Sequence, residues 1–244
     1  MRRVDAGEAN VAESVRAELF ARLREQETSV APEQIARALA ALGHAQPARA
    51  THTDLHTAFL ANVLANKGTV ELARDRGAAV QAIGRYLYQR FRTHKLVAGN
   101  DPRLAAMPWR DGGVLPRFGA AENGDSAALS YARLGVAETG AIVTYTGRAN
   151  PGRNNLLPED HLVLINREDV VSTLEDAWAR IRHDTAASGW PRGIQFIAGP
   201  SSTADVEAQL VMGAHGPRRW HVILVGDTPA EVLAQASGGV GATS

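Results

Sequence analysis

Three titratable side chains stand beside segments that we expect to form strands. Glu138 precedes the apolar run 141–145, and burial there would raise the pKa of its carboxyl, which could then act as an acid, a base or a nucleophile. The same carboxylate could instead stand in water at a sheet edge. His161 and His215 precede later apolar runs and could exchange protons near neutral pH, although histidines in turns commonly only donate one N–H to a carbonyl. We take Glu138 and His161 as candidate catalytic residues and His215 as a candidate ligand-binding residue.

A segment rich in Ser and Thr follows the apolar run 194–198 and is the strongest candidate for anion binding. We expect it to begin a helix over residues 204–212, with Ser202 or Thr203 as the N-cap. Unpaired backbone N–H groups at a helix start can bind a carboxylate or a phosphate. The alternative is a well-capped helix in which the Ser and Asp side chains serve only local N–H groups. The residues of this candidate site are Gly199, Pro200, Ser201, Ser202, Thr203 and Asp205.

The connection 146–155 between two expected strands is a second candidate for anion binding. It contains two Arg, three Asn and two Gly, and Arg153 offers a fork of N–H donors that matches a planar anion. The alternative is a solvated loop in which Asn and Gly are chosen for their turns. We therefore place Arg153 among the ligand-binding candidates.

Composition excludes several classes of function. Lys+Arg 26 balance Asp+Glu 26, so neither a nucleic acid nor a membrane is the expected partner. Because the chain has Cys 0, it can form no disulfide and can hold no iron–sulfur cluster by itself. His52 and His56 have the spacing of a metal pair, but Asp54 is expected to cap a helix that leaves His52 outside, so we expect no metal site. The absence of a long apolar run favours a soluble, cytoplasmic protein.

The elements that position these residues indicate an α/β fold. The first ninety residues have helical apolar spacing, and short runs rich in Val and Ile then alternate with helical segments. Such runs predict a three-layer sandwich with a largely parallel, buried sheet covered by helices, preceded by an N-terminal helical extension. We expect the extension over residues 1–50, the α/β domain over 51–235 and a flexible tail over 236–244.

Four ordered blocks of sequence resemble the LUD domain family, and within it the lactate utilization protein C family. The blocks are Glu138-Thr139-Gly140, then Arg153-x-x-Leu156-Leu157-Pro158-x-x-His161, then Gly199-Pro200-Ser201-x-Thr203-Ala204-Asp205-x-Glu207, and His215-Gly216-Pro217-x-x-x-His221-Val222. The resemblance covers about residues 95–226. It implies a fold similar to the group of ribose-5-phosphate isomerase, CoA-transferase and 5-formyltetrahydrofolate cyclo-ligase.

The resemblance also implies a part in oxidising L-lactate to pyruvate, beside partner proteins that carry iron–sulfur clusters. In the first interpretation this chain is a non-redox subunit that binds a small carboxylate or phosphate and no cofactor of its own. In the second it is a stand-alone enzyme of the cyclo-ligase or CoA-transferase type that uses Glu138. In the third its N-terminal helices are a scaffold that docks the cluster-bearing partners or a second copy of the chain, as in a homo-oligomer.

Overall fold

The computed structural model describes residues 6–25, 30–43, 52, 54–206 and 209–239. The chain divides into two compact units, Met1–Gln46 and Pro47–Ser244. The domain boundary that we expect at residue 50 lies outside the described residues. The two units are treated separately below.

Unit 1 consists of two helices, α1 (Ala6–Glu25) and α2 (Pro32–Ala41). Pro32 stands at the first helical position of α2, where its missing N–H costs nothing. Among the described side chains of unit 1, the apolar residues at helical spacing are exposed, and Leu19 and Leu39 show 59% and 62% of their surface. The helical extension expected from the sequence is therefore present as two separate helices.

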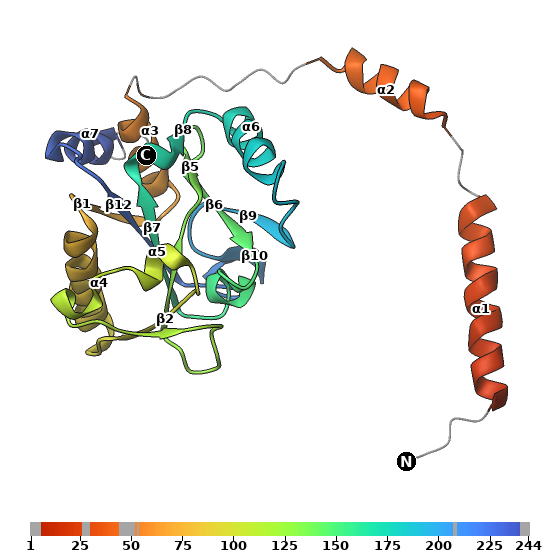
Figure 1. The fold of residues 1–244 in the computed structure, drawn as a ribbon, viewed down its shortest axis with the longest axis horizontal. Coiled ribbons are helices and arrows are strands. Elements are labelled where there is room, and N and C mark those ends of the chain that lie inside the picture. Colours follow the sequence, from red (N-terminus) through yellow and green to blue (C-terminus); the bar gives the residue numbers. More distant parts are fainter. Residues whose placement is uncertain (1–5, 26–29, 44–51, 53, 207–208, 240–244) are drawn as a thin grey trace. The chain divides into compact units, whose positions relative to one another are not determined.

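Unit 2 is built around a six-stranded sheet in which every neighbouring pair of strands is parallel (Figure 1). In spatial order the strands are β1 (Thr69–Ala73), β12 (Arg219–Val225), β7 (Asp160–Asn166), β4 (Ala127–Tyr131), β2 (Lys95–Ala98) and β3 (Leu115–Phe118). The central strand β7 is buried from Asp160 to Ile165, as a strand covered on both faces requires.

Helices and a second sheet cover the two faces of the parallel sheet. On one face lie α4 (Arg76–Phe91), α5 (Pro102–Ala105) and the short 3-10 helix η1 (Trp109–Gly112), with Ile83 and Leu104 in the shared core. On the other face lie α3 (Leu55–Ala65) and α7 (Ala230–Gly239), with Phe59 and Ala236 buried. The predicted α/β fold with a largely parallel, doubly covered sheet is confirmed, and the segment 236–239 of the expected tail is helical.

The second sheet is mixed and has the order β8-β5-β6-β9. Its strands are β8 (Val170–Val171), β5 (Leu134–Val136), β6 (Ala141–Thr146) and β9 (Gly193–Ile197). The helix α6 (Leu174–Thr185) packs on it through Ala177 and Ile181. The apolar runs 141–145 and 194–198 therefore pair with each other as antiparallel strands, and neither belongs to the parallel sheet.

The helix predicted over residues 204–212 is wrong. The segment forms a hairpin of β10 (Ser202–Val206) and β11 (Gln209–Met212), in which Ser202 faces Met212 and Thr203 faces Val211. Nine residues are shorter than a stable isolated helix needs, and a short apolar pattern fits a strand as well as a helix. Backbone pairing within the hairpin therefore decides the structure here.

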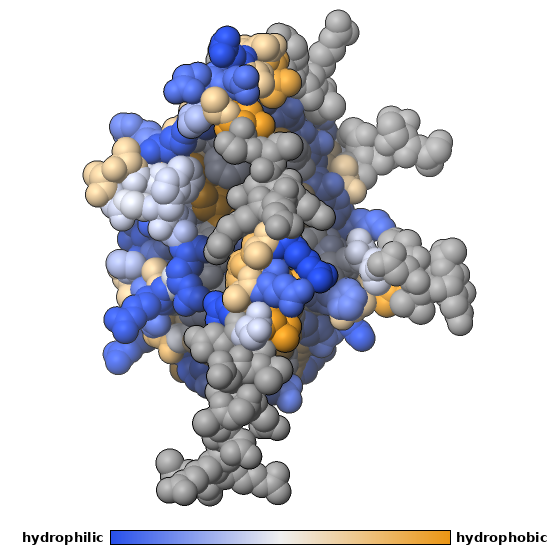
Figure 2. Space-filling view, turned by 90° about the vertical axis from the view of Figure 1, so that its right-hand side faces the viewer, coloured by the Kyte–Doolittle hydropathy of each residue, from blue (hydrophilic) through white to orange (hydrophobic). Residues whose placement is uncertain are grey.

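On the face that Figure 2 shows, hydrophilic residues cover most of the coloured surface, and hydrophobic residues form small separate groups. Among the described residues, no helix is both long and apolar enough to span a membrane.

Candidate anion-binding site

A pocket of about 340 Å³ opens where the strands β2 and β4 end. We call it the arginine pocket, and define it by Tyr131, Arg133, Tyr145, Arg148, Asn150 and Arg192. Tyr131 is the last residue of β4, and Asp101, which also lines the pocket, follows β2 after a short turn. Ligands of open α/β sheets bind beyond the carboxyl ends of the parallel strands, so this pocket has the position expected of a ligand site.

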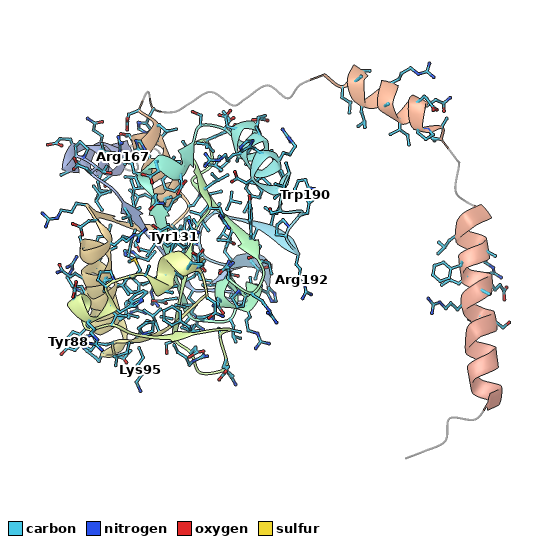
Figure 3. The ribbon with its side chains drawn as sticks, viewed as in Figure 1. Tyr88, Lys95, Tyr131, Arg167, Trp190 and Arg192 are labelled. Carbon is cyan, nitrogen blue, oxygen red and sulfur yellow. The ribbon has the colours of Figure 1, made fainter. Side chains whose placement is uncertain are left out.

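The second sheet brings the three arginines to this place. Arg133 directly precedes β5, Arg148 follows the end of β6, and Arg192 directly precedes β9. The backbone N–H of Arg133 donates to the carbonyl of Val143 in β6 at 2.8 Å, and the antiparallel pair β6–β9 sets Thr146 opposite Gly193. The ends of three neighbouring strands therefore each supply one guanidinium. Figure 3 labels Tyr131 and Arg192 of this pocket.

The arginine pocket carries unneutralised positive charge. Its carboxylate, Asp101, is already paired with Arg103, whose Nη2 and Nε donate to Oδ2 and Oδ1 at 2.8 and 3.1 Å. Burial alone would raise the pKa of Asp101, but the hydrogen bonds from Arg103 outweigh burial and lower that pKa. Among the described residues, no carboxylate lies within 4.0 Å of the guanidinium groups of Arg133, Arg148 or Arg192. An anion entering the pocket would meet these three groups without displacing an existing ion pair.

Asn150 adds a buried donor to the wall of the pocket. Its side chain is 7% exposed, and its amide nitrogen Nδ2 has no hydrogen-bond partner among the described residues. A buried polar group without a partner costs free energy, so such a group at a pocket wall indicates a missing ligand atom. The amide nitrogen of Asn150 is therefore suited to donate to an oxygen of a bound anion.

A buried polar network holds the loop that carries Arg148 and Asn150. The Ser130 hydroxyl in β4 lies 2.7 Å from Asn155 Oδ1 and 3.2 Å from Asn150 Oδ1. Asn155 Nδ2 donates to Thr144 Oγ1 at 3.0 Å, and Asn154 accepts from the Ala121 N–H at 2.7 Å. The asparagines of the connection 146–155 thus anchor it to the strands beneath, and the 3-10 helix η2 (Gly152–Asn155) is part of that anchor.

His161 belongs to this network and does not titrate near neutral pH. It is 1% exposed, its Nε2 lies 3.0 Å from the Ser130 hydroxyl, and burial lowers the pKa of its imidazole to about 3. The ring is therefore neutral at pH 7 and a weak base. The structure gives His161 a supporting role beneath the loop, in place of the acid–base role expected from the sequence.

Glu138 lies at the other end of β6 from the arginine pocket. Its Oε2 accepts from the Leu174 N–H at 2.9 Å, at the start of α6. The strand β6 begins at Ala141 beside Glu138 and ends at Thr146 beside the pocket, which separates the two by roughly 17 Å at about 3.4 Å per residue. The carboxylate favours the amino end of a helix, where the helix dipole is positive. Glu138 therefore cannot act on a ligand bound among the three arginines.

Arg153 also lies outside the arginine pocket. Its Nη1 donates to the Ala121 carbonyl at 3.3 Å, and its side chain lines an open depression together with Leu156 and Leu157. The connection 146–155, which the sequence predicts as a candidate for anion binding, thus contributes Arg148 to the pocket but not Arg153.

The last two sequence blocks contact each other in the structure. The Ser201 N–H donates to the Pro217 carbonyl at 2.9 Å, and a side chain at Gly216 would meet Ser201 and the Leu156 carbonyl. This junction has no helix start, because Ser202 and Thr203 are strand residues, and the Ser201 N–H is already paired. The predicted anion site at a helix N-terminus is therefore wrong.

The remaining predicted residues surround this junction. Gly199 has φ 101° and approaches the Asn66 carbonyl, Pro200 is half-buried and His215 is exposed. Asp205 lies in β10, but its side chain is outside the described residues. None of these three described residues lines the arginine pocket.

Sequence reasoning missed Arg133, Arg192, Tyr131 and Tyr145. Tyr131 and Tyr145 stand at or near the carboxyl ends of β4 and β6, and Arg133 and Arg192 directly precede β5 and β9. A cation directly beside the end of an apolar run was the available signal. Among the described residues, no cluster of three or more His, Cys, Asp or Glu could hold a metal ion.

Comparison with known proteins places this fold and site in context. The family model of the LUD domain matches residues 125–225, which include β4 to β12 and all six residues that define the arginine pocket. This chain is 28% identical over 177 residues to lactate utilization protein C of Exiguobacterium sp., a match that covers 68% of this chain and 76% of that protein.

Two further relatives match over shorter stretches. Lactate utilization protein C of Halalkalibacterium halodurans is 37% identical over 41% of this chain and 44% of its own length. That of Geobacillus thermodenitrificans is 34% identical over 51% of this chain and 52% of its own length. The matched part of this chain thus spans about half the length of these two relatives.

A solved structure supports the fold alone. A DUF162 family protein from Deinococcus radiodurans aligns with a TM-score of 0.52 at 20% identity, over 70% of this chain and 96% of that chain.

Proposed function

Because this chain belongs to the lactate utilization protein C family and carries a LUD domain, we propose that it serves lactate utilization by binding a small carboxylate or phosphate in the arginine pocket. The names of the relatives support a role in lactate utilization, and the pocket supports the binding of a small anion. In this proposal the chain positions an anion and does not itself exchange electrons.

One observation carries the proposal. Within the described part of the chain, a buried amide donor without a hydrogen-bond partner lies in the wall of a pocket that three guanidinium groups without a carboxylate partner also line. Asn150 provides the donor, and Arg148 stands two residues before it on the same anchored connection. A carboxylate accepts hydrogen bonds from both kinds of group, and a charged acceptor makes each of them stronger.

The proposal assigns electron transfer to partners. Oxidation of lactate to pyruvate removes a pair of electrons, and the chain, with Cys 0, has no thiolate to ligate an iron–sulfur cluster. We propose that iron–sulfur proteins receive those electrons while this chain holds the acid. The chain itself then needs no bound cofactor.

Calorimetric titration with L-lactate and with pyruvate tests the proposal. Arg148→Gln and Asn150→Asp are each expected to weaken anion binding about tenfold or more, because each removes a charge-assisted contact. Arg110→Gln is the matched control, since Arg110 is an exposed arginine of η1 that lies outside the pocket. Equal affinities for the wild type and both pocket variants would refute the proposal.

A scaffold role is the second candidate, and one observation favours it. The helix α2 carries Ile35, Leu39 and Leu42 at helical spacing, and these side chains are 49%, 62% and 80% exposed. An apolar stripe on an amphipathic helix is a common docking surface for another protein. The stand-alone enzyme using Glu138 has no comparable support, because that carboxylate is engaged at the start of α6.

A further inference from the structure

We infer that the ligand of the arginine pocket carries two separate negatively charged groups, one more than lactate has. This inference rests on the proposed function and adds the class of substrate to it. The expected ligand is a 2-hydroxy or 2-oxo acid with a second carboxylate or a phosphate at its other end.

The charge of the pocket is the first argument. Three guanidinium groups line it, and its carboxylate, Asp101, is neutralised by Arg103. A single carboxylate would leave most of this positive charge uncompensated, and like charges gathered in one pocket repel each other. A second anionic group on the ligand would balance the pocket more closely.

The placement of the arginines is the second argument. Arg133 stands at the end of β5 and Arg192 at the end of β9, and β6 runs between these two strands. Neighbouring strands lie about 4.8 Å apart, and the register sets Arg133 and Arg192 three residues apart along β6. With about 10 Å across the strands and about 10 Å along them, the backbones of these two arginines are separated by roughly 14 Å. Each guanidinium binds one oxyanion best as a fork. Forks that start from opposite sides of a pocket favour a ligand with anionic groups at both ends.

The size of the pocket is the third argument. It holds about 340 Å³. Lactate has only about six non-hydrogen atoms and would fill roughly half of this volume, even at about 30 Å³ for each, the share of liquid volume that a water molecule takes. The remaining space is sufficient for another carboxylate or phosphate.

These arguments assign different tasks to the arginines. Arg148 and Asn150 lie on one connection and, together with Arg133, bind the carboxylate next to the hydroxyl or oxo group. Arg192 enters from the segment before β9 and binds the second anionic group. The affinity for a ligand with two anionic groups then depends more strongly on Arg192 than the affinity for lactate does.

A matched series of ligands tests the inference by calorimetry. L-Lactate, L-malate and 3-phosphoglycerate are all 2-hydroxy acids, and they differ in carrying no second anion, a carboxylate or a phosphate. The wild type is expected to bind malate, 3-phosphoglycerate or both at least about tenfold more tightly than lactate. The stronger of the two identifies the second group as carboxylate or phosphate.

The variant Arg192→Gln is expected to weaken the binding of malate or 3-phosphoglycerate about tenfold more than the binding of lactate, and so to abolish that preference. Arg192 is exposed, and a melting curve of the variant verifies its fold. Arg110→Gln again serves as the matched control and should keep the preference. A preference that survives in Arg192→Gln would overturn the inference.

The failure of the inference differs from the failure of the proposed function. If lactate binds as tightly as malate and 3-phosphoglycerate, the surplus charge only attracts anions, and the inference is overturned while the proposed function stands. If none of the three ligands binds, both are overturned.

Discussion

Outside the pocket, the buried carboxylate of Asp160 joins its own strand to side chains from two other elements. It is 0% exposed at the start of β7, and its Oδ2 accepts from the Tyr86 hydroxyl at 2.8 Å. Arg90 and Arg219 each approach it at 3.3 Å. Burial and then the hydrogen bond to Asp160 raise the pKa of Tyr86, so the hydroxyl keeps the proton that it donates. The cluster ties α4 to the amino ends of β7 and β12.

Asp160→Asn is therefore expected to lower the free energy of unfolding by about 2–4 kcal/mol, because it removes a fully buried carboxylate that two arginines and the Tyr86 hydroxyl contact. Urea unfolding monitored by circular dichroism gives this quantity. Asp184→Asn is the control, since Asp184 forms an exposed pair with Arg180 on α6 and should cost less than about 0.5 kcal/mol. Similar decreases in the free energy of unfolding for the two variants would show that the burial of Asp160 adds nothing to its contribution to stability.

Two buried histidines predict how stability changes with pH. Burial lowers the pKa of His161 to about 3 and that of His221 to about 4, although Glu71 and Asp160 pull the latter upward. In the unfolded chain a histidine has a pKa of about 6.5, so below that pH the unfolded state binds protons that the folded state does not bind. Stability is therefore full above about pH 6.5 and falls as the pH decreases.

Each histidine contributes a slope of up to about 1.4 kcal/mol per pH unit between about pH 5 and 6. Unfolding free energies measured at several pH values across that window give the total slope. His161→Gln should remove about half of it, and His183→Gln, which changes an exposed residue of α6, should leave it unchanged. A slope that is equal in wild type and His161→Gln would be evidence against this assignment.

The candidate site could be predicted only in part from the sequence. The connection 146–155 was identifiable from its Arg, Asn and Gly residues, yet Arg148 and Arg153 were indistinguishable there. The direction of each side chain depends on how Asn150, Asn154 and Asn155 fasten the connection to the strands below. Those hydrogen bonds join residues far apart in the sequence, and no local pattern reveals them.

At the scale of elements, the turn between β5 and β6 gives a structural reason for the sequence block 138–140. Asn62 of α3 donates to the Ala137 carbonyl at 2.7 Å, and Asn66 donates to the Thr139 carbonyl at 2.8 Å. Gly140 ends the turn with φ 68°, and a Cβ there would lie 2.5 Å from the backbone carbon of Asn62. The block Glu138-Thr139-Gly140 therefore fits a turn against a helix, and needs no catalytic explanation.

Gly140→Ala is expected to destabilise the protein by about 2–4 kcal/mol, because the new methyl group meets helix backbone and the positive φ disfavours a side chain. Thermal melting measures the loss. Gly147→Ala is the matched control, since nothing lies within 4 Å of a Cβ at that position and its φ is not positive. A Gly140→Ala variant as stable as Gly147→Ala would show that α3 yields easily at this contact.

A difference in burial separates the central strands, which the sequence predicts, from the hairpin β10–β11, which it does not. The runs 162–165 and 222–225 are apolar at every position, as a strand buried on both faces needs, and both belong to central strands. In the segment 204–212 the apolar residues alternate from Ala204 to Met212, as in a strand, but Val206 and Leu210 also have helical spacing, so its period is ambiguous. Its hairpin structure depends on pairing between β10 and β11, which the local sequence does not determine.

At the scale of the whole molecule, every buried core side chain among the described residues lies in unit 2. A chain that lacks residues 1–46 is therefore expected to keep its melting temperature within about 2 °C and its affinity for anions unchanged. Calorimetry of the shortened and the full chain measures both quantities. A larger drop in melting temperature would show that the two units stabilise each other.

The deletion of residues 1–46 also tests whether the N-terminal extension docks a partner protein. If the apolar stripe of α2, with Ile35, Leu39 and Leu42, docks an iron–sulfur protein, the shortened chain will bind anions normally but fail to co-purify with that protein. Leu39→Glu in the full chain should have the same effect as the deletion, because it places a charge in the centre of the stripe. Glu33→Lys, which changes a charge in the first turn of α2, is the matched control and should leave association intact. Association that persists in the shortened chain would exclude a docking role for the extension and leave unit 2 as the surface that partners bind.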